Sequence, residues 1–338
     1  MGSATWARVA SSVVGLFLSV WGAATGATEG PSLAGKTVVL LVGSAPGGGF
    51  DRLARVLARH LPKHLPGRPV VVVQNMPGAG GIVAANHLYH AVRPDGLTIA
   101  LLSSDLLTAQ LTGAEGVRFD MLRFQWIGSP VVEAGVLAIR ADLPVRDWRD
   151  LRRPGQSVVV GLTGPGSFAY NWTLLLKAFL GLNLRPVVGY PSAAEIILAM
   201  ERKEVDAYGF YWSSAQPYLQ RGFVRPVIRT VSDIPEMREI PADADLVPEG
   251  ITRRVLLVRS TVERIGRPLL APPDTPGAMI SLHREALRRL SEDSDFVVEV
   301  RRAGFVPGLK LGEEALRMAR EFLRAEASVV RILREIYR

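Results

Sequence analysis

Two glycine-rich segments, at residues 45–51 and 75–81, stand about thirty residues apart near the start of the chain. Each follows a run of β-branched and aliphatic residues and precedes a stretch with apolar residues at helical spacing. Glycine at a strand-to-helix turn adopts a positive φ without strain and lets a ligand approach the main chain closely. The helix N-terminus that follows offers unpaired N–H groups and the positive end of the helix dipole. Two neighbouring turns of this kind predict a site that holds an anion through backbone N–H groups.

Other chemical motifs in the chain are incomplete. The first glycine segment lacks the Lys and Ser/Thr pair of a nucleotide-phosphate loop, and neither segment contains a dinucleotide-binding G-x-G-x-x-G pattern. The serine of segment 164–168 is one position away from a nucleophile elbow. His60 and His64 have helical spacing, but Pro62 lies between them and no third metal ligand is evident. We therefore expect no enzyme activity, no cofactor and no metal site.

Charge and cysteine content narrow the class of protein. The chain has 40 Lys and Arg against 32 Asp and Glu, a net charge of +8, but no basic stripe alternates with aromatic residues. This distribution favours a diffuse attraction for small anions and does not favour nucleic acid as a partner. The sequence contains no cysteine, which excludes disulfides and a lipoprotein anchor. A hydrophobic core must therefore stabilise the fold.

Residues 1–27 are typical of a secretory signal peptide. A single positive charge, Arg8, precedes an apolar stretch at 9–24 and a tail of small residues, with cleavage expected after Ala24 or Ala27. The alternative is a retained membrane anchor, but the apolar stretch is shorter than the roughly 20 residues that usually span a bilayer. We therefore expect an exported protein.

The rest of the chain alternates strand and helix patterns. The first unit predicts a strand at 37–42, a helix at 51–61, a strand at 70–73, a helix at 82–91 and a strand at 97–102. The second predicts a strand at 136–139, a short helix at 145–152, a strand at 156–161, a helix at 168–180, a strand at 185–190, a helix at 192–203 and a strand at 205–210. This order favours parallel, doubly wound sheets, in which ligands lie beyond the carboxyl ends of the strands.

The same alternation of strands and helices occurs twice, which predicts two lobes. We expect lobe 1 to comprise 28–133 and 246–338, and lobe 2 to comprise 134–245. Helices expected at 277–290 and 313–337 carry apolar residues at helical spacing. We expect them to pack on their own lobe, and a partner-binding helix is the alternative. On the first helix, Arg52 is expected to face solvent.

Seven short segments occur in a characteristic order along the chain. They are PGGGFD at 46–51, NMPGAGG at 75–81, PDGLT at 94–98, GPGS at 164–167, EVDA at 204–207, APPDTP at 271–276 and DSDF at 293–296. Together they resemble the hallmark motifs of the tripartite tricarboxylate transporter substrate-binding proteins, the Bug or TctC family. The resemblance covers nearly the whole mature chain.

This resemblance implies both a fold and a function. The fold is α/β, of the two-lobed periplasmic-binding-protein-like type II, with a mostly parallel sheet flanked by helices in each lobe and the ligand cleft between the lobes. The function is that of a periplasmic, monomeric receptor. It closes around a small organic carboxylate and delivers it to the membrane permease subunits of a tripartite tricarboxylate transporter.

The resemblance also carries over a set of ligand-binding positions. In the two glycine segments these are Pro46, Gly47, Gly48, Gly49, Phe50, Asp51, Asn75, Pro77, Gly78, Ala79, Gly80 and Gly81. The second lobe adds Thr163, Gly166, Ser167 and Tyr211. Each position has a structural alternative: the glycines serve only as turn residues, Asp51 caps its own helix, Asn75 bonds within its own loop, and Tyr211 packs in the core.

Three departures from the usual family pattern bear on the ligand. Phe50 stands where relatives commonly carry Thr or Ser, Met76 replaces a usual Arg, and the segment 190–192 (YPS) stands where a tyrosine-lysine-glycine turn is common. These changes remove a hydroxyl and two cations and add an apolar ring. We therefore expect a carboxylate that is less charged than citrate, such as an aromatic or branched monoacid.

Two other functions stay open at the level of sequence. One is a ligand-sensing module that presents its closed form to a membrane sensor kinase. The other is an exported enzyme that uses the glycine loops as an oxyanion hole, although no nucleophile is paired with a base in the sequence.

Overall fold

The computed structural model describes residues 31–155 and 157–337. The expected signal peptide at 1–27 lies outside these residues. Within them, no helix combines the length and the apolar character that a membrane span requires.

The first sheet has six strands in the order β11-β4-β10-β3-β1-β2. They are β1 (Thr37–Val42), β2 (Val70–Asn75), β3 (Thr98–Leu101), β4 (Gln125–Val132), β10 (Leu269–Ala271) and β11 (Val306–Leu311). β1 pairs in parallel with β2 and β3, whereas β10 runs antiparallel to β3 and β4, and β11 runs antiparallel to β4. Because β1 is an interior strand, it is almost continuously aliphatic, and Leu40, Leu41 and Val42 are all buried.

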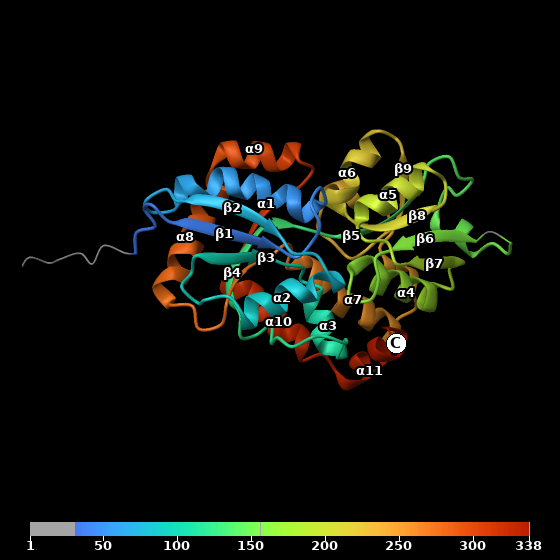
Figure 1. The fold of residues 1–338 in the computed structure, drawn as a ribbon. Coiled ribbons are helices and arrows are strands. Elements are labelled where there is room, and N and C mark those ends of the chain that lie inside the picture. The colour runs from blue at the N-terminus through green and yellow to red at the C-terminus, as the bar shows by residue number, and fades with distance from the viewer. Residues whose placement is uncertain (1–30, 156, 338) are drawn as a thin grey trace, which may run out of the picture. The chain divides into compact units, whose positions relative to one another are not determined.

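The second sheet has five strands in the order β7-β6-β8-β5-β9. They are β5 (Gly135–Arg140), β6 (Val158–Leu162), β7 (Leu184–Val188), β8 (Ala207–Tyr211) and β9 (Val224–Arg229). β6 pairs in parallel with β7 and β8, and β5 runs antiparallel to β8 and β9. Figure 1 shows the two sheets beside one another, with β5 following directly from the first sheet.

Both sheets share one strand order. In each sheet, the second strand of the β-α-β-α-β run lies at the edge, the first strand lies next to it, and the third follows. The strand that arrives from the other sheet then pairs antiparallel with the third strand. Each sheet is therefore mixed, not mostly parallel as expected. The physical reason is that the chain passes from one sheet to the other. A strand that enters from the neighbouring sheet runs antiparallel to the third strand of the β-α-β-α-β run. We call the elements around the first sheet the first lobe and those around the second sheet the second lobe.

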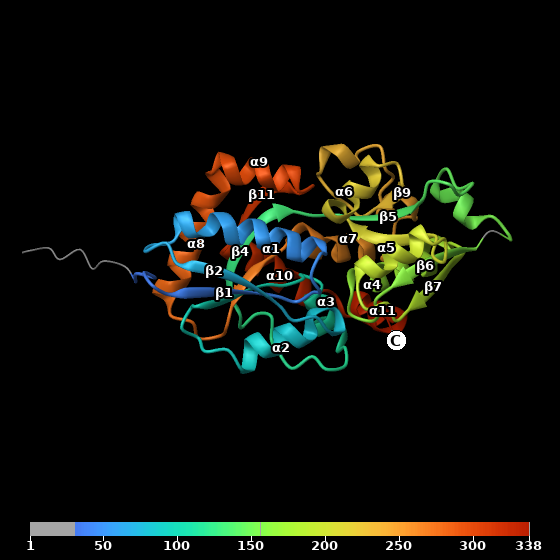
Figure 2. The same cartoon turned by 45° about the horizontal axis from the view of Figure 1, so that its top comes forward.

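Helices cover both faces of the sheets (Figures 1 and 2). Around the first sheet lie α1 (Gly49–His60), α2 (Ile82–His90), α3 (Leu106–Thr112), α8 (Gly277–Glu292), α9 (Ser294–Arg302) and α10 (Gly312–Leu323). Around the second lie α4 (Phe168–Leu180), α5 (Ala193–Glu201) and α6 (Trp212–Gln220). The short helix expected at 145–152 is a 3-10 turn, Trp148–Arg152, capped reciprocally by Asp147 and Asp150.

One hydrophobic cluster joins the two sheets. It contains Trp126 and Leu270 from the first sheet and Leu137 from the second, together with Trp172 of α4 and Val255 of α7 (Ile251–Arg264). Separate clusters cover the opposite face of each sheet. The interior is thus continuous across the crossover and does not divide into two independent cores.

The expectation of a single helix at 313–337 is wrong. α10 ends at Leu323 and a separate helix, α11 (Ala327–Tyr337), follows a turn. The turn redirects the chain so that α11 packs against α3, α4 and α7, and Val329 and Leu333 are fully buried in the shared cluster. α11 therefore contacts helices of both lobes, not of its own lobe alone.

Truncation of Leu333 tests this bracing role of α11. We expect Leu333→Ala to lower the free energy of unfolding by about 2–5 kcal/mol, because it leaves a cavity in the cluster that joins the lobes. The exposed Arg331 on the same helix is the matched control, and Arg331→Ala should change stability by less than about 0.5 kcal/mol. Urea unfolding measures both, and an equal effect of the two variants would contradict the packing.

Candidate functional site

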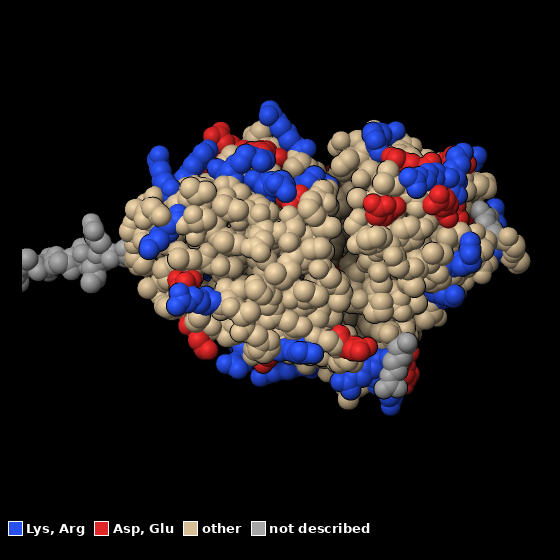
Figure 3. All heavy atoms as spheres, in the orientation of Figure 1, with Lys and Arg blue, Asp and Glu red and all other residues tan. Residues whose placement is uncertain are grey.

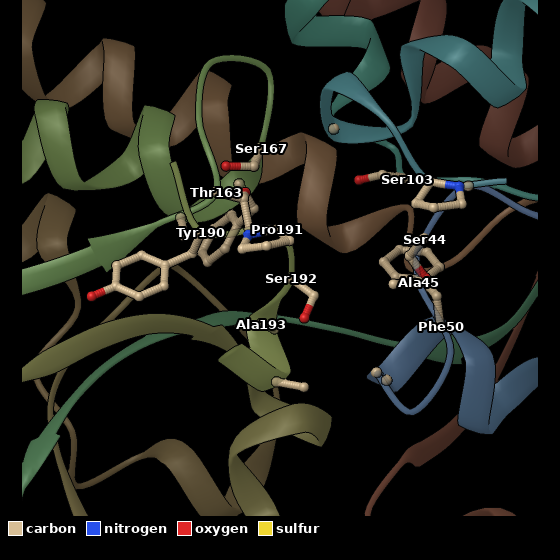
Figure 4. Close-up of a pocket in the computed structure, with 18 of the residues that line it drawn as sticks. Ser44, Ala45, Phe50, Ser103, Thr163, Ser167, Tyr190, Pro191, Ser192 and Ala193 are labelled. Atoms are coloured by element: carbon tan, nitrogen blue, oxygen red, sulfur yellow. The ribbon is translucent and has the colours of Figure 1, made fainter. Parts of the chain in front are cut away.

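A cavity of about 720 Å³ lies between the two lobes. Its wall is formed by the loops that follow β1, β2 and β3 in the first lobe and β6, β7 and β8 in the second. A cleft separates the two lobes in the space-filling view, and its visible edges carry few charged side chains (Figure 3). In Figure 4, Ser44, Phe50 and Ser103 face Thr163, Ser167 and the segment 190–193 across this cavity.

The first glycine loop connects β1 to α1 and is tied down by Asp51. Gly47 has a φ of +84°, and its N–H donates to Asp51 Oδ2 at 2.9 Å. Arg55 holds the same carboxylate through Nε and Nη2, at 2.9 and 3.0 Å. Within residues 31–155 and 157–337 no side chain caps the N-terminus of α1, so its first-turn N–H groups remain free for another acceptor.

Ionisation of Asp51 fits this supporting role. Burial acts to raise the pKa of the Asp51 carboxyl, but the hydrogen bonds from Arg55 and from the Gly47 N–H outweigh it and leave the pKa below its ordinary value. Asp51 is 3% exposed and does not line the cavity. The ionised Asp51 carboxylate therefore holds the first glycine loop in place from outside the cavity.

The second glycine loop depends on left-handed backbone. Gly78, Ala79, Gly80 and Gly81 all have positive φ, and the Gly81 N–H closes a turn onto the Gly78 carbonyl at 2.9 Å. Among the described residues no side chain caps α2 either, and the N–H of its first residue, Ile82, donates to the Ala79 carbonyl of the preceding turn. Asn75 Nδ2 donates to the Ser44 carbonyl at 2.9 Å and so links the two glycine loops.

The second lobe contributes a capped helix N-terminus. Ser167 is the N-cap of α4: its Oγ accepts from the Tyr170 N–H at 3.3 Å and donates to the Gly164 carbonyl at 2.8 Å. The Ser167 hydroxyl and Thr163 both line the cavity. The hydroxyl is therefore held by its own loop, and Ser167 lies across the cavity from Ser103 of the first lobe (Figure 4).

The structure brings most of the predicted positions, from both lobes, to the lining of one cavity. Those that line the cavity are Pro46, Gly47, Gly48, Gly49, Phe50, Pro77, Gly78, Ala79, Gly80, Thr163, Ser167 and Tyr211. Those that do not are Asp51, Asn75, Gly81 and Gly166. Asp51 and Asn75 make the loop contacts described above, and Gly81 faces the carbonyl of Gly43. Gly166 lies at the contact between the lobes.

Other residues of the wall were not expected from the sequence. They include Arg52, Ser103, Phe168, Ser214 and Tyr218. Arg52 was expected to face solvent, and it is instead half-buried at the cavity because it lies in the first turn of α1, directly behind the glycine loop. Ser103 follows β3 and Ser214 lies in the first turn of α6, so the shared signal is a position just after a cleft-facing strand.

Two glycines allow the lobes to touch. A Cβ at Gly80 would lie 2.9 Å from the backbone carbonyl carbon and oxygen of Gly166. A Cβ at Gly49 would lie 2.3 Å from Ser214 Oγ, which also belongs to the opposite lobe. A side chain at Gly80 would force one lobe away from the other, whereas a side chain at Gly49 would displace the Ser214 and Arg267 side chains.

A buried polar network links the lobes beneath the cavity. The Tyr211 hydroxyl, from β8, donates to Asp105 at the start of α3, and Ser103 Oγ lies 3.4 Å from the Tyr211 oxygen. Arg259 of α7 donates to Asp105 Oδ1 at 2.9 Å and pairs with Glu263. Burial and the nearby Asp105 carboxylate raise the pKa of Tyr211, so it stays neutral and donates. Tyr211 thus joins the lobes while its ring lines the cavity.

The wall is mainly neutral and includes several aromatic rings. Among the described residues that line it, only Arg52 and Glu115 carry a charged side chain, and none is a histidine, lysine or aspartate. Burial and the nearby Arg267 lower the pKa of Arg52. Phe168 stacks on Tyr211, with ring centroids 4.7 Å apart. The described residues contain no cluster of three or more His, Cys, Asp or Glu side chains with metal-binding geometry.

The fold and the cavity together place the protein in the class of two-lobed α/β proteins with a cavity between the lobes. A family model described as "Tripartite tricarboxylate transporter family receptor" matches residues 53–333, and the chain belongs to this family. Protein BugT from Bordetella pertussis (strain Tohama I) is 25% identical over 271 residues, which are 73% of this chain and 80% of BugT. The resemblance found in the sequence is therefore confirmed.

Solved structures confirm the periplasmic-binding-protein-like fold. MatC from Rhodopseudomonas palustris, solved with bound malate, has a TM-score of 0.69 at 19% identity and covers 89% of this chain and 99% of its own. A second protein from the same organism, solved with adipate, has a TM-score of 0.72 at 20% identity and covers 88% of this chain and 97% of its own.

The contact between Gly80 and Gly166 generates a prediction. We expect Gly80→Ala to separate the two loops and to increase amide hydrogen exchange at 164–167, because its Cβ cannot fit against the Gly166 backbone. Both Gly80→Ala and the control Gly47→Ala should lose about 1–2 kcal/mol of stability from left-handed strain. Gly47→Ala has no atom within 4 Å of its Cβ, so exchange at 164–167 should stay unchanged. The same exchange rate in both variants would disprove the contact.

Proposed function

We propose that the protein captures a small carboxylate through backbone N–H groups of the two glycine loops. The observation that carries this proposal is the pair of uncapped helix N-termini, α1 and α2, whose loops line one cavity. Free N–H groups and the positive helix ends favour an anion at this place. The malate and adipate in the two similar structures are both carboxylates.

The energetics of such a site are sufficient for useful affinity. Charge-assisted hydrogen bonds contribute roughly 1.5–3 kcal/mol each. Three or four of them supply most of the roughly 8 kcal/mol that corresponds to a micromolar Kd, before the cost of ordering. The Ser167 hydroxyl and Thr163 on the opposite lobe complete the polar surroundings of the carboxylate.

We further propose how the protein works in the cell. It is exported to the periplasm, acts as a monomer and delivers its ligand to the permease subunits of a tripartite transporter. Family membership supports this role. Residues 28–133 with 246–338, and residues 134–245, are the two lobes that close on the ligand, and the close glycine contacts between them support closure.

A thermal-shift screen of residues 28–338 tests capture of a carboxylate. The compounds are dicarboxylates, tricarboxylates, aromatic acids and amino acids, with sugars and organic cations for comparison. A ligand at a hundred times its Kd adds roughly 2.7 kcal/mol of stability, so we expect a clear rise in Tm for at least one carboxylate.

Two glycine variants decide whether the loops bind the hit. Gly48 lies at the N-cap of α1, and Gly277 is the matched position at the first residue of α8, with no atom within 4 Å of its Cβ. Gly48→Leu should abolish the shift, because its side chain blocks the wall, whereas Gly277→Leu should keep it. A hit restricted to sugars or cations, or one that survives Gly48→Leu, would refute the proposal.

A further inference from the structure

A buried arginine lies directly behind the cavity wall. Arg267 is fully buried, with 0% exposure, and it does not line the cavity. Its Nε donates to Glu133 Oε1 at 2.7 Å, and its Nη2 donates to Ser213 Oγ at 2.9 Å and to Ser214 Oγ at 3.3 Å. The guanidinium is thus held by residues from both lobes.

One nitrogen of this guanidinium is left without an acceptor. Among the described residues, Arg267 Nη1 has no hydrogen-bond partner although it is buried. A buried donor without an acceptor is costly, and donors on a charged group are more costly than neutral ones. Glu133 pairs with Nε, so it does not satisfy Nη1. The structure therefore keeps a free cationic donor in its interior.

The glycine loop and two rings of the cavity wall, those of Phe50 and Tyr211, lie against this guanidinium, and the Phe50 ring is the nearer. The Phe50 ring centroid lies 4.2 Å from Arg267 Cζ, and the rings of Phe305 and Tyr211 lie at 5.1 and 5.4 Å. Phe50 lines the cavity on its other side. A Cβ at Gly49 would lie 2.9 Å from both Nη1 and Nη2, which shows how closely the guanidinium approaches the loop.

The ring and the cation stabilise each other where they are. A cation stacked on an aromatic face gains about 2 kcal/mol or more when it is shielded from water. The ring also presents carbon to the cavity at the point where a guanidinium would otherwise be accessible. Position 50 therefore decides whether this end of the cavity is apolar or cationic.

We propose that Phe50 determines ligand specificity by covering Arg267. The native cavity then selects a monocarboxylate with an apolar body, which rests against the Phe50 ring. Without the ring, Arg267 Nη1 becomes a second anion-binding position, and the cavity takes an acid at each end. This inference rests on the proposed capture of one carboxylate by the glycine loops.

The test compares straight-chain diacids of four to eight carbons with monoacids of the same length, on the full mature chain. Calorimetry and thermal shift measure the Kd of each acid for the native protein and for Phe50→Ala. We expect Phe50→Ala to raise the affinity for at least one diacid, relative to its matched monoacid, about tenfold or more. The ratio removes the effect of the larger cavity, which acts on both acids of a pair.

Two further variants identify the cation. Phe50→Leu keeps an apolar cover and should leave the ratio within about threefold of the native value. Arg52, which also lines the cavity, is the competing cation. The gain should persist in Phe50→Ala/Arg52→Gln, and its loss there would assign the second position to Arg52 and overturn the proposal. Arg52 is half-buried, so the double variant should fold, and its Tm is measured first.

The remaining outcomes separate the two levels of the proposal. If monoacids bind in a manner that depends on Gly48 but Phe50→Ala gains no diacid, the role of Phe50 is wrong and carboxylate capture stands. A native protein that already prefers diacids over matched monoacids would also refute the role of Phe50. If no carboxylate in the screen or in this series binds either protein, the proposed function itself fails.

Discussion

The absence of a side chain where the lobes meet is the constraint on which the rest of the structure depends. At Gly80 the backbone of one lobe lies against the backbone of Gly166 in the other, and at Gly49 it lies against the Ser214 hydroxyl. Because neither position carries a Cβ, two helix N-termini and their loops converge on one cavity. The same backbone that permits the lobe contact also leaves uncapped N–H groups at α1 and α2. The lobe contact and the uncapped helix N-termini therefore share one physical cause.

Buried ion pairs next to the cavity hold the two lobes in this relative position. Arg259 joins Asp105 of the first lobe to the crossover helix α7, and Arg267 joins Glu133 to serines at the start of α6. Such pairs add little net stability over apolar residues, but breaking one leaves an isolated buried charge at a cost of several kcal/mol. They therefore specify one relative position of loops that a purely apolar contact would allow to slide. Tyr211 extends the Asp105 network to the cavity wall.

The cavity combines the two glycine loops with a mostly neutral remainder that includes several aromatic rings. Glycine loops recognise an acid group without regard to what is attached to it, because main-chain N–H groups contact only the oxygen atoms. Discrimination among acids must then come from the rest of the wall, where Phe50, Phe168 and Tyr211 present rings. The proposed function divides these roles, with the glycine loops binding the acid group and a few ring positions selecting among acids.

The sequence by itself determined the glycine turns, the family and the elements of both β-α-β-α-β runs, because these depend on local periodicity and on residues with special backbone freedom. Asp51 and Asn75 do not take the alternative roles expected for them, because Asp51 binds the Gly47 N–H and does not cap α1, and Asn75 donates to the Ser44 carbonyl beside the other glycine loop. Only the tertiary structure decided the antiparallel strands β4, β10 and β11, the break before α11, and the place of Arg52 on the wall. Glu133 and Arg267 lie 134 residues apart, and neither signals the other in the chain. Contacts of this kind arise from how the crossovers bring the two sheets together, and no local pattern encodes them.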